Sequence, residues 1–158
     1  MAGKTSGLER VRAAAEALGL PIEIVTMPDS TRTAEEAAAA CGCPVGAIVK
    51  SLVFVGRESR RPILMLVSGV NRVDEEAVAR DLGEAVDRPD ARFVREVTGF
   101  AIGGVAPFGH ATPLATRIDR ALLAHDRVWA AAGTPHAVFS VDPRDLAGRI
   151  GAEPIDLV

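Results

Sequence analysis

Two apolar runs separated by a short polar segment constrain the fold of this 158-residue chain more than any other feature. Residues 47–55 (AIVKSLVFV) and 62–68 (PILMLVS) are apolar at nearly every position, whereas residues 56–61 form a polar turn. Such a pattern predicts a β-hairpin. Strands that lack polar alternation are typical of sheets covered on both faces. We therefore expect a hairpin with other elements packed on both of its sides.

Helical and strand patterns are interleaved irregularly along the rest of the chain. Thr33 and Glu36 form a capping box at the start of one helix, and residues 91–97 fit either a short strand or a turn of helix. The remaining patterns predict helices at residues 6–18, 33–41, 75–82 and 143–151 and strands at residues 22–27, 114–119, 127–133 and 136–141. This order indicates one mixed α/β or α+β domain over residues 1–158 and not a doubly wound parallel sheet.

Composition and charge narrow the class of protein. No apolar stretch approaches the roughly 18 residues that a membrane span requires, and the N-terminus lacks the apolar core of a signal peptide. We therefore expect a cytoplasmic protein without a membrane partner. The formal net charge is −3, which argues against a large DNA-binding surface because such surfaces are usually basic. A short nucleic-acid end is compatible with this charge, since few phosphates would need to be neutralised.

Neither the cysteines nor the histidines show a metal-binding pattern. Cys41 and Cys43 are the only cysteines, and one CxC pair offers too few ligands for a structural zinc site. His110, His125 and His136 lie in loop-like segments without metal-ligand spacing. The sequence therefore predicts no metal and no other cofactor.

Lys50 interrupts the first apolar run and is unusual for this chain. Sixteen of the eighteen basic residues are arginine, and the second lysine is Lys4. Burial of an ammonium is costly, so one interpretation is a side chain near a strand end that reaches water. The other is a compact charge that faces a cavity and binds an oxyanion, a carbonyl or a phosphate. In that case Ser51, on the opposite face of the strand, would reach the cavity only through its backbone.

Residues 98–113 (TGFAIGGVAPFGHATP) form a second candidate segment, with four glycines and two prolines. The pair Gly103 and Gly104 can expose backbone N–H groups and let a ligand approach closely. His110 ends this loop, where it could face a site. The segment lacks the glycine patterns of P-loop and dinucleotide-binding proteins. A tight structural crossover is the alternative interpretation.

In their order along the chain, the segments STRTAEEAA, VGAIVKSLVF, LVSG, TGFAIGGVAPFGH and AAGTP resemble the YbaK/EbsC family. The most specific part is the spacing between the strand lysine and the glycine-rich loop. The resemblance implies a single compact α/β domain with a curved, mixed, largely antiparallel sheet flanked by helices. It also implies a deacylase related to the editing domain of bacterial prolyl-tRNA synthetases, which hydrolyses the ester between a wrong amino acid and the 3′ end of tRNA without a metal.

The resemblance further implies which residues form the site. Lys50, Gly103 and Gly104 are expected to be catalytic, with N–H groups of the glycines as oxyanion donors and the ammonium binding the tRNA end or the developing charge. The walls of the pocket are expected to include Asp29, Ser30 and strand 62–68. No general base is obvious, so help from the substrate's 2′-hydroxyl is a hypothesis. The expected substrate-binding residues are Thr31, Thr33, Ser51, Ser68, Gly69, Val105, Pro107, Gly109, His110, Gly133 and Thr134.

Two departures from the family leave the substrate open. Ser51 follows the lysine where many members have asparagine or threonine, and the loop reads GGVAPFG. The expected substrate is therefore tRNA(Pro) that carries a small non-cognate amino acid such as alanine, serine, threonine or cysteine, with prolyl-tRNA synthetase as a further partner. Alternatives are a non-catalytic module that binds a nucleotide or an aminoacyl-adenylate-like ligand, and an interaction protein that docks on a synthetase.

Overall fold

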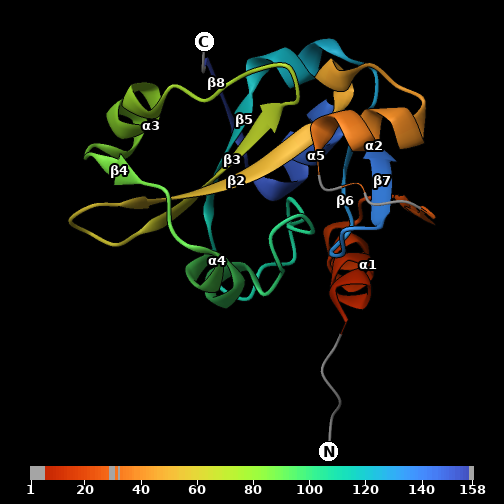
Figure 1. Cartoon of the computed structure of the whole chain (residues 1–158), viewed down its shortest axis with the longest axis horizontal. Coiled ribbons are helices and arrows are strands. Elements are labelled where there is room, and N and C mark those ends of the chain that lie inside the picture. The colour runs from red at the N-terminus through yellow and green to blue at the C-terminus, as the bar shows by residue number, and fades with distance from the viewer. Residues whose placement is uncertain (1–5, 29–30, 32, 157–158) are drawn as a thin grey trace, which may run out of the picture.

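The computed structural model describes residues 6–28, 31 and 33–156 (Figure 1). Its α-helices are α1 (Gly7–Leu18), α2 (Ala34–Cys41), α3 (Glu75–Leu82), α4 (Ala91–Thr98) and α5 (Pro143–Ile150). Its strands are β1 (Glu23–Thr26), β2 (Val49–Gly56), β3 (Pro62–Ser68), β4 (Val86–Asp87), β5 (Ala115–Asp119), β6 (Val128–Ala131), β7 (Ala137–Val141) and β8 (Glu153–Ile155). Two short 3-10 helices are η1 (Val45–Ala47) and η2 (Arg120–Ala124). None of the described helices is long and apolar enough to cross a membrane.

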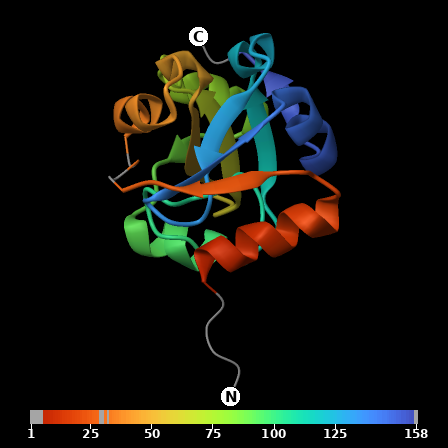
Figure 2. The same ribbon diagram turned by 90° about the vertical axis from the view of Figure 1, so that its right-hand side faces the viewer.

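The predicted hairpin is confirmed as β2 and β3, which pair in antiparallel register with Val49 opposite Ser68. It lies inside a five-stranded sheet of order β4-β2-β3-β5-β8, in which β5 is parallel to both of its neighbours. A second, antiparallel sheet has the order β1-β7-β6 (Figure 2). One parallel bridge between Ile48 and Trp129 joins the two. The mixed α/β fold is therefore confirmed, with the strands divided between two sheets.

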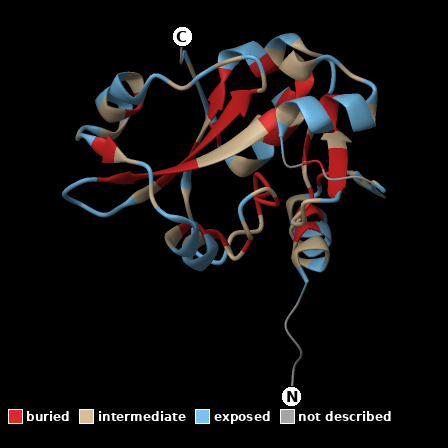
Figure 3. Ribbon diagram, viewed as in Figure 1, coloured by how far each residue is buried: buried red, intermediate tan, exposed pale blue. Residues whose placement is uncertain are grey.

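Both faces of the hairpin are buried over most of its length, as its apolar pattern predicted (Figure 3). Val53 of β2 belongs to one core cluster, which includes Val105 of the glycine-rich segment. Phe54 belongs to another, which includes Val78 of α3. Successive side chains of a strand point to opposite faces. Strand β2 therefore separates the glycine-rich segment from α3.

Two helices begin where side chains satisfy free backbone donors. The Thr33 hydroxyl accepts a hydrogen bond from Glu36 N at 3.1 Å, which confirms Thr33 as the N-cap of the predicted capping box. Residues 91–97, for which the sequence allowed two structures, lie in α4. There the Asp90 carboxylate accepts a hydrogen bond from Phe93 N at 2.9 Å. Because a helix leaves its first N–H groups without partners, this bond stabilises the helical alternative.

Three elements differ from the sequence-based expectation. Ala47 N bonds to Pro44 O at 3.0 Å and closes the turn η1, so the first hairpin strand begins at Val49 and not at residue 47. Strands β4 and β8 span two and three residues, which is too short for hydrophobic periodicity to indicate them. The other predicted helices and strands are present, with small differences at their ends.

Candidate functional site

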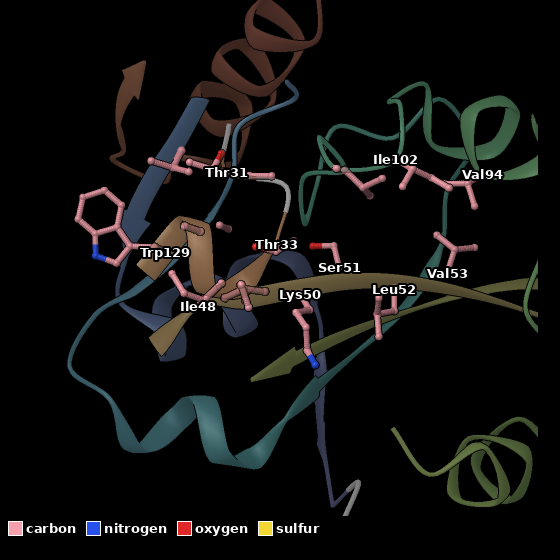
Figure 4. A pocket seen from close by; sticks show the side chains of 18 of the residues that line it. Thr31, Thr33, Ile48, Lys50, Ser51, Leu52, Val53, Val94, Ile102 and Trp129 are labelled. Atoms are coloured by element: carbon pink, nitrogen blue, oxygen red, sulfur yellow. The ribbon is translucent and has the colours of Figure 1, made fainter. Parts of the chain in front are cut away.

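A cavity of about 390 Å³ opens beside β2 (Figure 4). Strand β3 pairs with one edge of β2, but β4 pairs with the other edge only at Val55 and Gly56. Residues 49–54 therefore have a free strand edge within the described structure. Most of the cavity wall is apolar and includes Ala34, Ala37, Ile48, Val53, Val94, Ile102 and Trp129.

The cavity gathers six of the residues that the sequence indicated. They come from the loop before α2, from β2 and from the glycine-rich segment, which are far apart along the chain. These six are Thr31, Thr33, Lys50, Ser51, Gly103 and Val105. Eight further predicted residues do not line it, namely Ser68, Gly69, Gly104, Pro107, Gly109, His110, Gly133 and Thr134. Asp29 and Ser30 lie outside the described residues.

Ser51 and Lys50 face opposite sides of β2 (Figure 4). The Ser51 side chain lies on the side of Val53 and Ile102. Its hydroxyl is buried without a hydrogen-bond partner among the described residues, which costs roughly 1–3 kcal/mol. Ser51 thus reaches the cavity with its side chain, and not only through its backbone as the sequence suggested.

Lys50 has a defined position at the free edge of β2. Its Nζ donates a hydrogen bond to the Asn71 carbonyl oxygen at 2.6 Å. Burial is the main cause that lowers the pKa of Lys50 from its ordinary value. The ammonium is therefore held by the chain and is only partly exposed to water.

The two adjacent glycines have different surroundings. Gly103 lines the cavity and has a φ of 91°, a left-handed conformation that favours glycine. Gly104 N donates to Ala101 O at 2.9 Å, and a Cβ atom on Gly104 would lie 2.9 Å from Thr134 Cα. Gly104 therefore allows close backbone packing, and its N–H is already bonded. Gly103 and Val105 line the cavity together with Ile102 of the same loop.

Arg10 of α1 holds both ends of the glycine-rich loop. Its guanidinium donates to Gly99 O at 3.2 Å and to Gly109 O at 3.0 Å. It also lies over the Phe100 ring, 5.1 Å from the centroid, in a cation–π contact. No feature of the sequence indicates this role of Arg10, because it is one of sixteen arginines and stands in no motif.

His110 supports the same loop from inside and does not line the cavity. Its Nε2 lies 2.8 Å from the Ala106 carbonyl oxygen, and its ring meets Phe100 edge-on with the centroids 6.1 Å apart. Burial lowers the pKa of His110. The neutral ring therefore stabilises the loop conformation.

Hydrogen bonds of two other predicted residues, Thr31 and Ser68, fix segments that carry the cavity wall. The Thr31 hydroxyl donates to Pro135 O at 2.7 Å and ties the loop before α2 to the turn before β7. The Ser68 hydroxyl donates to Gly46 O at 2.8 Å and fixes the segment before β2. These bonds explain why a polar residue occurs at each position, although only Thr31 lines the cavity.

Ile102, Arg88 and Trp129 also line the cavity and were not predicted from the sequence. Ile102 is 56% exposed beside an apolar cavity, a signal that exists only in the folded chain. Trp129 is the single tryptophan, which is the one sequence signal that could have drawn attention to it. Among the described lining residues there is no histidine and no carboxylate.

Comparison with known proteins gives consistent matches. Residues 28–148 match the aminoacyl-tRNA editing domain family. The uncharacterized protein YwhH of Bacillus subtilis (strain 168) is 30% identical over 125 residues, which is 79% of each chain. The crystal structure of a proposed trans-editing enzyme for prolyl-tRNA synthetase is 47% identical, with a TM-score of 0.90 over 98% of both chains. The crystal structure of the hypothetical protein APE2540 is 30% identical, with a TM-score of 0.88 over 94% of this chain and 99% of that one.

Proposed function

The chain belongs to the aminoacyl-tRNA editing domain family, and we propose that it acts in trans as a hydrolase that removes a small, wrongly attached amino acid from the 3′ end of tRNA(Pro). The choice of tRNA is supported by the 47% identical structure of a proposed trans-editing enzyme for prolyl-tRNA synthetase. That similarity extends over almost the whole of both chains.

The observation that carries the proposal is an apolar cavity with unpaired polar groups on its wall. The Ser51 hydroxyl is buried there without a partner among the described residues. Gly103 and Val105 line the cavity, and their N–H groups bond to no backbone acceptor in the described part of the chain. An aminoacyl ester is already activated, so its hydrolysis mainly requires a positioned water and donors for an oxyanion.

The cavity is large enough to hold an aminoacyl group. Its volume of about 390 Å³ is near the lower end of the roughly 300–1,000 Å³ that small-molecule sites span. An apolar wall discriminates one methylene by only about 1–3 kcal/mol. We therefore propose that small side chains bind productively in this cavity and that the cognate proline does not, through its ring shape and not through its volume.

The proposed reaction uses groups of the loop and of the substrate. Water attacks the carbonyl carbon of the ester, and the carbonyl oxygen becomes an oxyanion that accepts hydrogen bonds from the Gly103 and Val105 N–H groups. The ester C–O bond then breaks, the 3′ oxygen of tRNA gains a proton, and the amino acid leaves. Because no described lining residue is a histidine or a carboxylate, the neighbouring 2′-hydroxyl of the substrate relays the proton. Ser51 Oγ orients the ester.

In this proposal Lys50 binds the phosphate or ribose of the terminal adenosine. Its ammonium lies on the side of β2 opposite to Ser51 (Figure 4), so it is not aimed at the group that would hold the ester. Arg88 also lines the cavity. Both side chains are cationic, and a compact ammonium and a guanidinium suit a negatively charged tRNA end.

Deacylation of charged tRNA tests this function. The protein is incubated with tRNA(Pro) that carries alanine, serine, threonine, cysteine or proline, and loss of the ester is followed against spontaneous hydrolysis. We expect removal of at least one small amino acid and retention of proline. Binding without ester loss would instead identify a non-catalytic module. Activity only after addition of prolyl-tRNA synthetase would show that the synthetase is a required partner.

A further inference from the structure

Asp119, the last residue of β5, has a buried carboxylate and does not line the cavity. It is 2% exposed and takes part in none of the ion pairs found among the described residues. Its Oδ2 accepts hydrogen bonds from Ser68 N at 3.0 Å and from Asn71 Nδ2 at 2.9 Å, and its Oδ1 accepts one from Ala121 N at 3.0 Å. A buried charge is costly unless such bonds satisfy it.

Two of these donors belong to the turn that follows β3. Asn71 N also donates to Ser68 O at 3.0 Å, so the turn is closed by its own bond and tied to Asp119 by two others. The turn presents the Asn71 carbonyl oxygen, which accepts the hydrogen bond from Lys50 Nζ at 2.6 Å. A continuous chain of hydrogen bonds therefore runs from Asp119 through Asn71 to Lys50, across the neighbouring strands β5, β3 and β2.

We propose that Asp119 is a positioning residue for Lys50, because it fixes Asn71 and thereby the carbonyl that holds the ammonium on one side of β2. Neither Asp119 nor Asn71 lines the cavity, so both act through Lys50. A lysine side chain is flexible, and without this anchor its charge would occupy many positions. The consequence for deacylation rests on the proposed function, whereas the positioning is a property of the folded chain alone.

The charges around Lys50 also predict how replacement of Asp119 changes the pKa of Lys50. Burial is the main cause that lowers the pKa of Lys50. Glu35 of α2 and Asp119 oppose this shift, whereas Arg72 of the turn and Arg88 add to it. Since a nearby carboxylate favours the ammonium form, replacement of Asp119 by neutral asparagine should lower the pKa of Lys50 further.

Lysine-selective NMR of the full-length protein tests the proposal, because Lys50 and Lys4 are the only lysines. With ¹³Cε-labelled lysine, the variant Lys4→Arg assigns the two signals. We expect Asp119→Asn to move the titration of the Lys50 signal to lower pH and to increase the mobility of its side chain. Asn71→Ala, which keeps the backbone carbonyl, should also increase this mobility. The control Asp156→Asn removes an exposed carboxylate and should change neither property.

An unchanged Lys50 signal in a folded Asp119→Asn protein would overturn the proposal. If that variant does not fold, unchanged mobility in Asn71→Ala overturns it instead. In the deacylation assay, Asp119→Asn should raise KM for the charged tRNA about tenfold and add nothing to the loss caused by Lys50→Ala. If the NMR changes appear but no charged tRNA is hydrolysed, the positioning is supported and the proposed function fails.

Discussion

Lys50 and Ser51 are consecutive residues of β2 whose side chains end on opposite sides of the strand (Figure 4). Lys50 Nζ is bonded to the Asn71 carbonyl oxygen, whereas Ser51 Oγ is buried without a partner among the described residues. The alternation follows from the pleat of a β-strand. In the proposed reaction, Ser51 therefore orients the ester and Lys50 binds the tRNA end, from opposite sides of the same strand.

Ser51→Ala should separate stability from activity. The hydroxyl has no bond to lose, so the free energy of unfolding should stay unchanged or rise by up to about 1 kcal/mol. The rate of deacylation should fall about tenfold, because the ester loses an orienting contact. Urea unfolding and single-turnover kinetics measure the two effects. The matched control is Ser68→Ala, which removes a hydroxyl bonded to Gly46 O and should lower stability. A similar loss of stability in both variants would contradict the assignment of Ser51.

Gly104→Ala should destabilise the protein by about 1–3 kcal/mol. Its Cβ would approach Thr134 Cα to 2.9 Å, and a backbone neighbour cannot move away cheaply. Gly148 in α5 provides the control, since a Cβ there meets no atom within 4 Å. Gly148→Ala should stabilise the helix by about 0.5–1 kcal/mol. Urea unfolding of both variants checks the prediction, and equal stability of the two would refute the close packing.

Arg10→Ala should loosen the glycine-rich loop and lower the free energy of unfolding by about 2 kcal/mol. The variant removes a guanidinium that bonds to Gly99 O and Gly109 O and covers the Phe100 ring. Arg12, an exposed arginine of the same helix, is the control, and Arg12→Ala should be nearly neutral. Hydrogen exchange at residues 99–109 together with urea unfolding measures the effect. Unchanged exchange in Arg10→Ala would show that other contacts hold the loop.

His110 should make stability depend on pH in the mildly acidic range. Burial lowers the pKa of His110 in the folded chain, so the unfolded chain binds a proton more readily. The stabilising contribution is complete above the ordinary histidine pKa and is lost as the pH falls from there toward the folded value. The free energy of unfolding, measured between neutral pH and pH of about 5, should fall more steeply in the wild-type protein than in His110→Gln. The same dependence of the free energy of unfolding on pH in both proteins would contradict the prediction.

Much of the fold could be predicted because it depends on short stretches of sequence. The two apolar runs define the hairpin, and the Thr33 hydroxyl caps α2 through its bond to Glu36 N. By contrast, β4 and β8 contain two and three residues and exist only because a neighbouring strand pairs with them. The division into two sheets, joined at Ile48 and Trp129, likewise depends on contacts between distant segments.

The site, too, could be predicted only where it depends on local sequence. The pleat of β2 showed that Lys50 and Ser51 point to opposite faces, but which of them faces the cavity depends on where the glycine-rich segment packs. The roles of Arg10 and Asp119 could not be predicted, since their partners lie far away in the sequence. Arg10 bonds to Gly99 and Gly109, which lie 89 and 99 positions further along the chain.

Hydrolysis of alanyl-tRNA(Pro) and prolyl-tRNA(Pro) by the wild-type protein and by Lys50→Ala tests the central claim most directly, with cysteinyl-, seryl- and threonyl-tRNA(Pro) completing the series. The account predicts that the wild type deacylates at least one tRNA with a small amino acid and spares prolyl-tRNA(Pro). Lys50→Ala, although folded, should lose about 100-fold in kcat/KM, and Lys50→Arg should not restore it because a planar guanidinium does not replace a compact ammonium. Equal activity of the wild type and Lys50→Ala, or no hydrolysis of any charged tRNA, would contradict the account.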